Sequence, residues 1–77
     1  MKVKATDNFK IVRLKKGFSQ TELAKRVGIT SQALGQIERR KIGVSPSTSS
    51  EILSHLNVKF DDIFEIVERM EEYGKTN

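Results

Sequence analysis

The chain has 77 residues, no cysteine, and 14 Lys and Arg against 10 Asp and Glu, which gives a formal net charge of +4. This length suffices for one small domain, and the lack of cysteine excludes disulfide bonds and thiolate zinc sites. No apolar run approaches the roughly 20 residues that span a bilayer, and the first seven residues contain no apolar signal-peptide core, so we expect a soluble, cytoplasmic protein.

Positive charge is concentrated in the first three quarters of the chain. Residues 1–56 carry a formal charge of +7, and residues 57–77 carry −3. This asymmetry favours a polyanion such as nucleic acid as the partner of one end of the protein. Small domains without such a partner can also be this charged, so charge alone does not decide the function.

The first predicted helix begins near Asn8 and ends at Gly17, after an N-terminal arm of residues 1–7. Phe9 and Val12 are spaced to face the core. The two lysines of the arm have two interpretations: they lie near a nucleic-acid duplex, or the arm has no role.

Two short helices follow, over about 20–27 and 31–39, joined by a tight turn. Ser19 and Glu22 form a capping-box pattern that starts the first of them. Gly28 stands where this helix must stop, because glycine enters the left-handed conformation without a steric cost.

The second of these helices has a narrow apolar stripe and an otherwise polar surface. Thr30 is a suitable N-cap, and Leu34 with Ile37 form the buried stripe. The remaining surface suits the edges of base pairs better than a protein core; it comprises Ser31, Gln32, Gly35, Gln36, Arg39 and Arg40.

The last part of the chain predicts a loop over 40–46, a helix from about Ser47 to Asn57, and a final helix from Phe60 to about residue 72. No strand is predicted. The fold class is therefore all-α with five helices, in a single domain over 1–77 whose core spans 8–66 and whose C-terminal extension and tail span 67–77. The predicted core consists of Phe9, Val12, Leu23, Ala24, Val27, Leu34, Ile37, Ile52, Leu53, Leu56, Val58, Ile63 and Phe64.

The spacing of Ala24, Gly28, Leu34 and Ile37 is that of a helix-turn-helix. Ala24 must be small because the second helix crosses close to it, and Gly28 must turn. Four more positions are in register with this pattern: Gln20, Leu23, Ile29 and Glu38. Over about residues 9–64 the chain resembles the Cro/C1-type (XRE-like) family of phage repressors and bacterial transcriptional regulators.

This resemblance implies a lambda-repressor-like domain whose third helix lies in the major groove of DNA. It nominates Thr30, Ser31, Gln32 and Gln36 as base-reading residues, and Gln20 as a phosphate-binding residue. The chemistry agrees, since Gln can pair bidentately with adenine, and Ser and Thr can bond to several base edges. Without the resemblance, an ordinary solvated helix face would account for both helix-three glutamines.

The resemblance also implies an ion pair between Arg13 and Glu38 that ties the first helix to the end of the third. The alternative is two unrelated surface charges. If the pair is buried, losing one partner is costly because the other charge is left stranded.

A basic triplet, Arg39, Arg40 and Lys41, is predicted to bind DNA phosphates, with Lys10 as a further candidate. Arg40 stands where a helix-ending glycine is common, so the third helix is expected to run longer, with Gly43 making the turn. Gly35 lies where the family usually presents a side chain to the bases; it either permits close approach to the groove or removes one contact.

The last helix carries an apolar stripe of Ile63, Val67 and Met70, with Ile66 beside it. We expect a homodimer contact along this stripe, which would place two recognition helices about 34 Å apart, one turn of DNA. In the alternative, the first residues of the stripe cover the domain's own base and Met70 lies in water.

These residues predict a sequence-specific DNA-binding transcriptional regulator, a dimeric repressor that reads a palindromic double-stranded operator. The first alternative is an antitoxin-type autoregulator that also sequesters a protein partner, and the second is a pure interaction module. No catalytic residue, metal ligand set, cofactor, small-molecule effector or membrane contact is predicted, since His55 is the only histidine and no phosphate-cradling glycine loop occurs.

Overall fold

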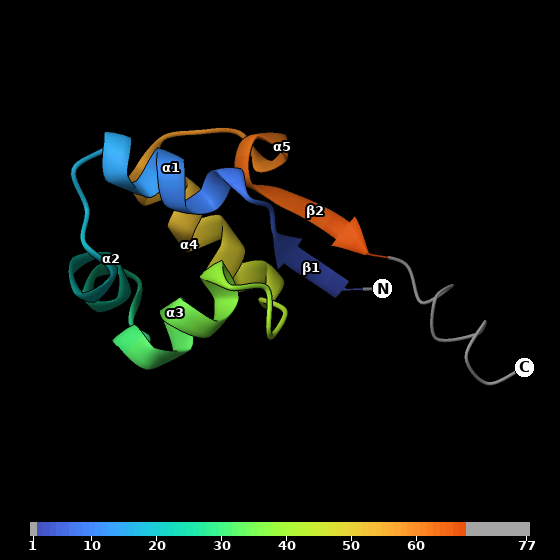
Figure 1. Ribbon diagram of the computed structural model, residues 1–77, viewed down its shortest axis with the longest axis horizontal. Coiled ribbons are helices and arrows are strands. Elements are labelled where there is room, and N and C mark those ends of the chain that lie inside the picture. Colours follow the sequence, from blue (N-terminus) through green and yellow to red (C-terminus); the bar gives the residue numbers. More distant parts are fainter. Residues whose placement is uncertain (1, 68–77) are drawn as a thin grey trace, which may run out of the picture.

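The computed structural model describes residues 2–67, in which five helices enclose one core and two strands lie side by side at one end (Figure 1). The elements follow in this order: β1 (Lys2–Ala5), α1 (Asn8–Lys15), α2 (Gln20–Val27), α3 (Ser31–Glu38), α4 (Pro46–Leu56), α5 (Phe60–Ile63) and β2 (Phe64–Val67). The five predicted helices are therefore present, and the two-stranded sheet is an addition that the sequence patterns do not predict.

The helix pair α2–α3 begins and turns at the residues that the sequence nominates. The Ser19 hydroxyl oxygen accepts a hydrogen bond from the Glu22 backbone N–H at 3.0 Å, and the Thr30 hydroxyl oxygen accepts one from the Ala33 N–H at 3.0 Å. Between the helices, Gly28 adopts φ 80°, a left-handed conformation that glycine takes without strain. These local contacts fix where each helix starts and how closely the second follows the first.

The end of α3 differs from the expectation of a longer helix. Arg40 itself takes the left-handed conformation, with φ 63°, although it carries a side chain. The Lys41 N–H donates to the Gln36 carbonyl at 2.9 Å and the Arg40 N–H donates to the Ile37 carbonyl at 3.0 Å, the pair of bonds that closes a Schellman helix end. Two satisfied carbonyls thus end the helix at Glu38 despite the absence of glycine.

The sheet corrects the predictions for both ends of the described chain. β1 and β2 pair antiparallel, with Val3 opposite Ile66 and Ala5 opposite Phe64. The expected N-terminal arm is thus largely a strand, and the expected final helix ends at Ile63 because Phe64 is extended, with φ −127° and ψ 161°. The β-branched residues that follow suit a strand as well as a helix, and pairing with β1 decides between them.

The loop before α4 is hydrogen-bonded to β1. The Val44 N–H donates to the Val3 carbonyl at 2.9 Å. Gly43 lies so close to β1 that a Cβ there would stand 3.1 Å from the Val3 carbonyl oxygen. Its role is therefore close backbone approach, and not the left-handed turn that the sequence suggests.

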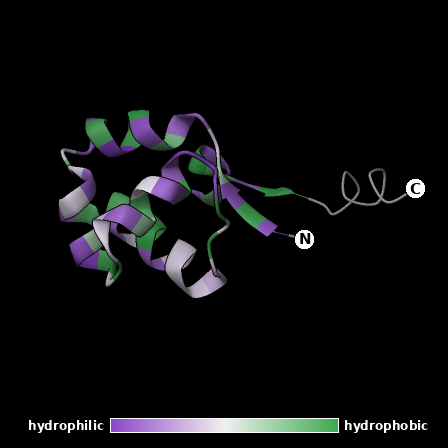
Figure 2. Ribbon diagram, turned by 60° about the horizontal axis from the view of Figure 1, so that its bottom comes forward, coloured by the Kyte–Doolittle hydropathy of each residue, from purple (hydrophilic) through white to green (hydrophobic). Residues whose placement is uncertain are grey.

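The core contains every residue predicted for it, either buried or packed against the buried cluster. Phe64 is buried in it, with its ring centroid 5.8 Å from that of Phe9 and 5.6 Å from that of Phe60. Ala5 and Val44 are buried additions contributed by the strand and the loop bridged to it. Figure 2 shows hydrophilic and hydrophobic residues alternating around the helices, the pattern of elements with one buried face. Within residues 2–67, no helix is long and apolar enough to cross a membrane.

Candidate nucleic-acid interface

The predicted base-reading residues lie together on the first two turns of α3. Thr30, Ser31 and Gln32 are exposed, and Gln36, one turn beyond Gln32, is half-buried. Residues four apart on a helix are neighbours on its surface, so the two glutamine side chains emerge from adjacent turns. The opposite side of α3 is held by Leu34, which is fully buried.

Thr30 has two roles in this arrangement. Its hydroxyl oxygen accepts the Ala33 N–H at 3.0 Å, so it caps the helix. The hydroxyl hydrogen and the methyl group are not used by this bond. Thr30 therefore retains a hydroxyl donor and an apolar methyl group at the N-terminal end of α3.

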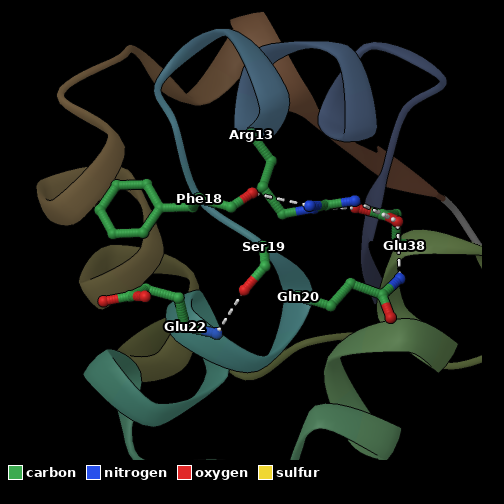
Figure 3. Close-up of polar contacts among 6 residues, drawn as sticks. All are labelled: Arg13, Phe18, Ser19, Gln20, Glu22 and Glu38. Carbon is green, nitrogen blue, oxygen red and sulfur yellow. Dashed lines mark hydrogen bonds and ion pairs between the residues drawn. The ribbon is translucent and has the colours of Figure 1, made fainter.

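Arg13 and Glu38 form the expected ion pair, and it is buried. Arg13 Nε lies 2.6 Å from Glu38 Oε2 and Nη2 lies 3.2 Å from Oε1, with side chains only 5% and 7% exposed. Arg13 Nη1 also donates to the Phe18 carbonyl at 2.8 Å, in the connection between α1 and α2 (Figure 3). A bidentate pair with a further backbone bond fixes the guanidinium in one orientation.

Gln20 adds α2 to this network. From the first turn of α2, its Nε2 donates to Glu38 Oε1 at 2.8 Å (Figure 3). One carboxylate therefore joins α1, α2 and α3. One Gln20 N–H is committed to Glu38, so the residue predicted to bind phosphate keeps one N–H and its carbonyl oxygen for other contacts.

The charge of Glu38 is stabilised by its surroundings. Burial acts to raise the pKa of this carboxyl, but hydrogen bonds from Arg13 and Gln20 and the positive charges of Arg13 and Lys10 outweigh it, so the pKa of Glu38 is lowered. Lys10 is exposed on α1, and its charge acts on the α3 carboxylate.

The basic triplet after α3 does not act as one cluster. Arg39 lies over α3, with its Nη1 3.3 Å from the position that a Cβ on Gly35 would occupy. Arg40 turns toward the sheet, where its Nη2 lies 2.7 Å from Glu65 Oε2 on β2. Lys41 is exposed. The sequence does not indicate the Glu65 partner, because the predicted final helix includes Glu65 and only the strand pairing brings Glu65 beside Arg40.

The residues predicted for a dimer contact do not share a helical stripe. Ile63 is fully buried and is therefore removed from any surface, whereas Ile66 is 51% exposed. Val67 is half-buried at the end of β2, and Met70 lies outside the described residues. Among the described residues, no group of three or more His, Asp or Glu side chains is placed to hold a metal ion.

A short helix packed across a second helix that presents its polar face outward is the defining unit of a helix-turn-helix domain. A family model described as helix-turn-helix matches residues 9–63, which include this unit and the helices around it. The chain belongs to the Cro/C1-type (XRE) helix-turn-helix family of DNA-binding transcriptional regulators. Proteins of this kind are typically not enzymes.

Solved structures of other proteins are similar to this fold. Eleven chains match, among them the crystal structure of the hypothetical transcription factor NHTF from Neisseria. That chain is 24% identical, the match covers 91% of this chain and 78% of that one, and the TM-score is 0.65. At this identity the likeness shows the fold alone. A search of curated proteins finds no significant match.

Proposed function

We propose that the chain represses transcription by binding a specific double-stranded DNA site as a homodimer, with α3 in the major groove. The observation that carries the proposal is the exposed polar face of α3 opposite a buried side. Ser31 and Gln32 reach outward from the helix, while Leu34 anchors it to the core. A recognition helix needs this rigid presentation, because base-edge contacts depend on fixed geometry.

Gln32 and Gln36 are the residues we assign to base recognition. Each amide offers one acceptor and one donor group, which match the N6 and N7 positions of adenine. Thr30 and Ser31 add hydroxyl groups near the N-terminal end of α3, and the Thr30 methyl suits the methyl group of thymine. The preferred half-site is therefore expected to contain A·T pairs.

Phosphate contacts supply the rest of the affinity. Lys10, Arg39 and Lys41 are exposed around the helix pair, and Gln20 holds one further amide N–H at the start of α2. Such contacts fix the protein on the duplex without reading sequence. Their charge makes binding weaken as salt increases.

The dimer contact is reassigned to β2, which pairs with β1 along one edge. Ile66 is half-exposed on this strand and Val67 ends it. An antiparallel pairing of β2 with its copy would be self-complementary, as two-fold symmetry requires. It would also cover the edge of β2 that pairs with no further strand within residues 2–67.

Selection of bound sites from random double-stranded DNA tests this function directly. Recovery of a palindromic site would support both sequence reading and the dimer, and placing that site over a promoter should block transcription in a purified system. Gln32→Ala and Gln36→Ala should each weaken specific binding by about 1–3 kcal/mol and leave non-specific binding unchanged. Ser54→Ala, at an exposed position on α4, is the control. Equal loss on specific and non-specific DNA would contradict base reading.

One observation favours the antitoxin-type alternative. Ile11 and Leu14 are 50% and 56% exposed on neighbouring turns of α1, a small apolar surface that a protein partner would cover. A heterologous protein that co-purifies with the wild-type chain and is lost with Leu14→Lys would support this role.

A further inference from the structure

Gly35 occupies a position where the backbone does not require glycine. It is buried in the interior of α3, and in the described residues the glycines with positive φ are Gly17 and Gly28. Glycine in a helix interior is less stable than alanine, because its unfolded chain has more freedom to lose. The requirement for a small residue must therefore come from neighbouring side chains.

Two polar side chains occupy the space beside Gly35. A Cβ there would stand 3.3 Å from Arg39 Nη1, 3.5 Å from Gln20 Oε1 and 3.7 Å from Gln20 Nε2. A separation of 3.3 Å is tighter than nine in ten real Cβ contacts, so the guanidinium would have to shift by a few tenths of an ångström. Arg39 follows Gly35 by one helical turn, whereas Gln20 comes from α2, so residues from two helices meet at this point.

Gln20 is held in place from its other side. Its Nε2 donates to Glu38 Oε1 at 2.8 Å, and Glu38 is fixed by the buried Arg13 guanidinium. The carbonyl oxygen of the same amide and Arg39 Nη1 stand 3.5 Å and 3.3 Å from the position of a Gly35 Cβ, so both side chains border the space above Gly35. An amide oxygen is an acceptor and attracts a guanidinium.

We propose that Gly35 is a positioning residue for DNA binding: by lacking a side chain, it allows Gln20 to orient the exposed Arg39 guanidinium toward a DNA phosphate. A phosphate oxygen is the matching ligand, since guanidinium binds phosphate through parallel N–H donors. The buried Arg13–Glu38 pair thereby sets the direction of a cation on the surface. This inference rests on the proposed DNA-binding function.

Gly35→Ala separates this role from a purely structural one. The nearest obstructing atom is the end of a flexible side chain, so the substitution should be accommodated and should raise Tm through better helix propensity, by up to about 4–8 °C. The affinity for DNA, in contrast, should fall. Displacing Arg39 should weaken specific and non-specific DNA binding by the same factor and make the salt dependence shallower, by at most the roughly one unit that loss of a whole phosphate contact gives.

A double-mutant comparison tests whether Gly35 affects DNA binding through Arg39. Wild type, Gly35→Ala, Arg39→Gln and the double variant are measured for Tm and for DNA affinity at several salt concentrations, with Ser54→Ala as a propensity control on α4. The inference expects no additional binding loss from Gly35→Ala once Arg39 is neutral. Wild-type affinity in Gly35→Ala, or an undiminished loss in the Arg39→Gln background, would overturn it.

A second comparison avoids dependence on one variant. If Gly35→Ala does not fold, Gln20→Ala and Arg39→Gln are combined instead. A loss of DNA-binding free energy in the double variant that is smaller than the sum of the two single losses supports positioning of Arg39 by Gln20. Strictly additive losses contradict it. A wild-type protein that binds no selected DNA would overturn the proposed function itself. A wild type that binds while the variants behave independently would overturn only the role of Gly35.

Discussion

The Arg40 guanidinium, one residue past the C-cap of α3, pairs with the Glu65 carboxylate of β2 at 2.7 Å. The two residues are 25 positions apart, and their side chains are 43% and 46% exposed. A pair this exposed contributes at most about 1 kcal/mol to stability. Its greater effect is on direction, because it turns one arginine of the basic triplet toward the sheet.

Removal of the Glu65 charge should release Arg40 for DNA. Glu65→Gln is expected to strengthen non-specific DNA binding and to steepen its salt dependence by up to about one unit, since one more cation becomes available to phosphate. Fluorescence anisotropy over a range of salt concentrations measures both effects. Glu51→Gln removes the same charge from an exposed site on α4 and is the control. An equal gain in DNA affinity in both variants would show that the change in net charge, and not the release of Arg40, causes the effect.

The left-handed conformation of Arg40 carries a steric cost. A residue with a Cβ in this region costs roughly 1–2 kcal/mol relative to glycine. Arg40→Gly should therefore raise the free energy of unfolding by about 1 kcal/mol after loss of the Glu65 pair. Urea denaturation gives the value. Arg40→Ala loses the same ion pair but keeps the Cβ, so equal stabilities of the Gly and Ala variants would exclude backbone strain as the cause.

The buried Arg13–Glu38 pair should be costly to break. Glu38→Gln leaves the Arg13 guanidinium without its counter-charge and is expected to destabilise the domain by about 3–5 kcal/mol. Arg13→Lys keeps the charge but loses the bidentate geometry, and should cost less. Thermal or urea denaturation compares the two. A loss below about 1 kcal/mol for Glu38→Gln would indicate that the pair behaves as an exposed one.

The same carboxylate predicts a pH dependence. Because the pKa of Glu38 is lowered in the folded protein from its ordinary 4.5, the charged form stabilises the fold above that value, and this stability is lost as pH falls through the lowered pKa. The difference in stability between wild type and Glu38→Gln should therefore begin to narrow below about pH 4.5 and narrow further as pH falls through the lowered pKa. A constant difference between them down to pH 2 would contradict this assignment.

The proposed dimer contact can be tested at a single exposed side chain. Ile66 is 51% exposed, so Ile66→Lys should leave the fold intact while placing two like charges at a two-fold interface. Sedimentation equilibrium should show a weaker dimer. Ile11→Lys makes the same change at a 50% exposed site on α1 and should not alter it. An unchanged dimer in Ile66→Lys would remove β2 from the interface.

Sequence patterns predict the local features of this protein well. Ser19, Gly28 and Thr30 act where they were expected, because a cap or a turn depends on residues within one helical turn. The apolar spacing of the helices likewise identifies Leu23 and Leu34 as core, since a periodic stripe must be covered.

Features that depend on distant segments were not predictable in this way. The strand Phe64–Val67 exists because β1 pairs with it, and the same residues carry an equally good helical spacing. Burial of Ala5 and the Arg40–Glu65 pair follow from that pairing. The contacts of Gly35 depend on how α2 crosses α3, which the sequence around Gly35 does not contain.

The pairing of Lys2 with Val67 also sets an order of assembly. During synthesis β1 is made before the five helices and β2 is made after them, so β1 stays unpaired with β2 while those helices form. Closing a loop of this length carries an entropic cost that local helix contacts do not. The nascent chain should therefore form its helices first and close its sheet last.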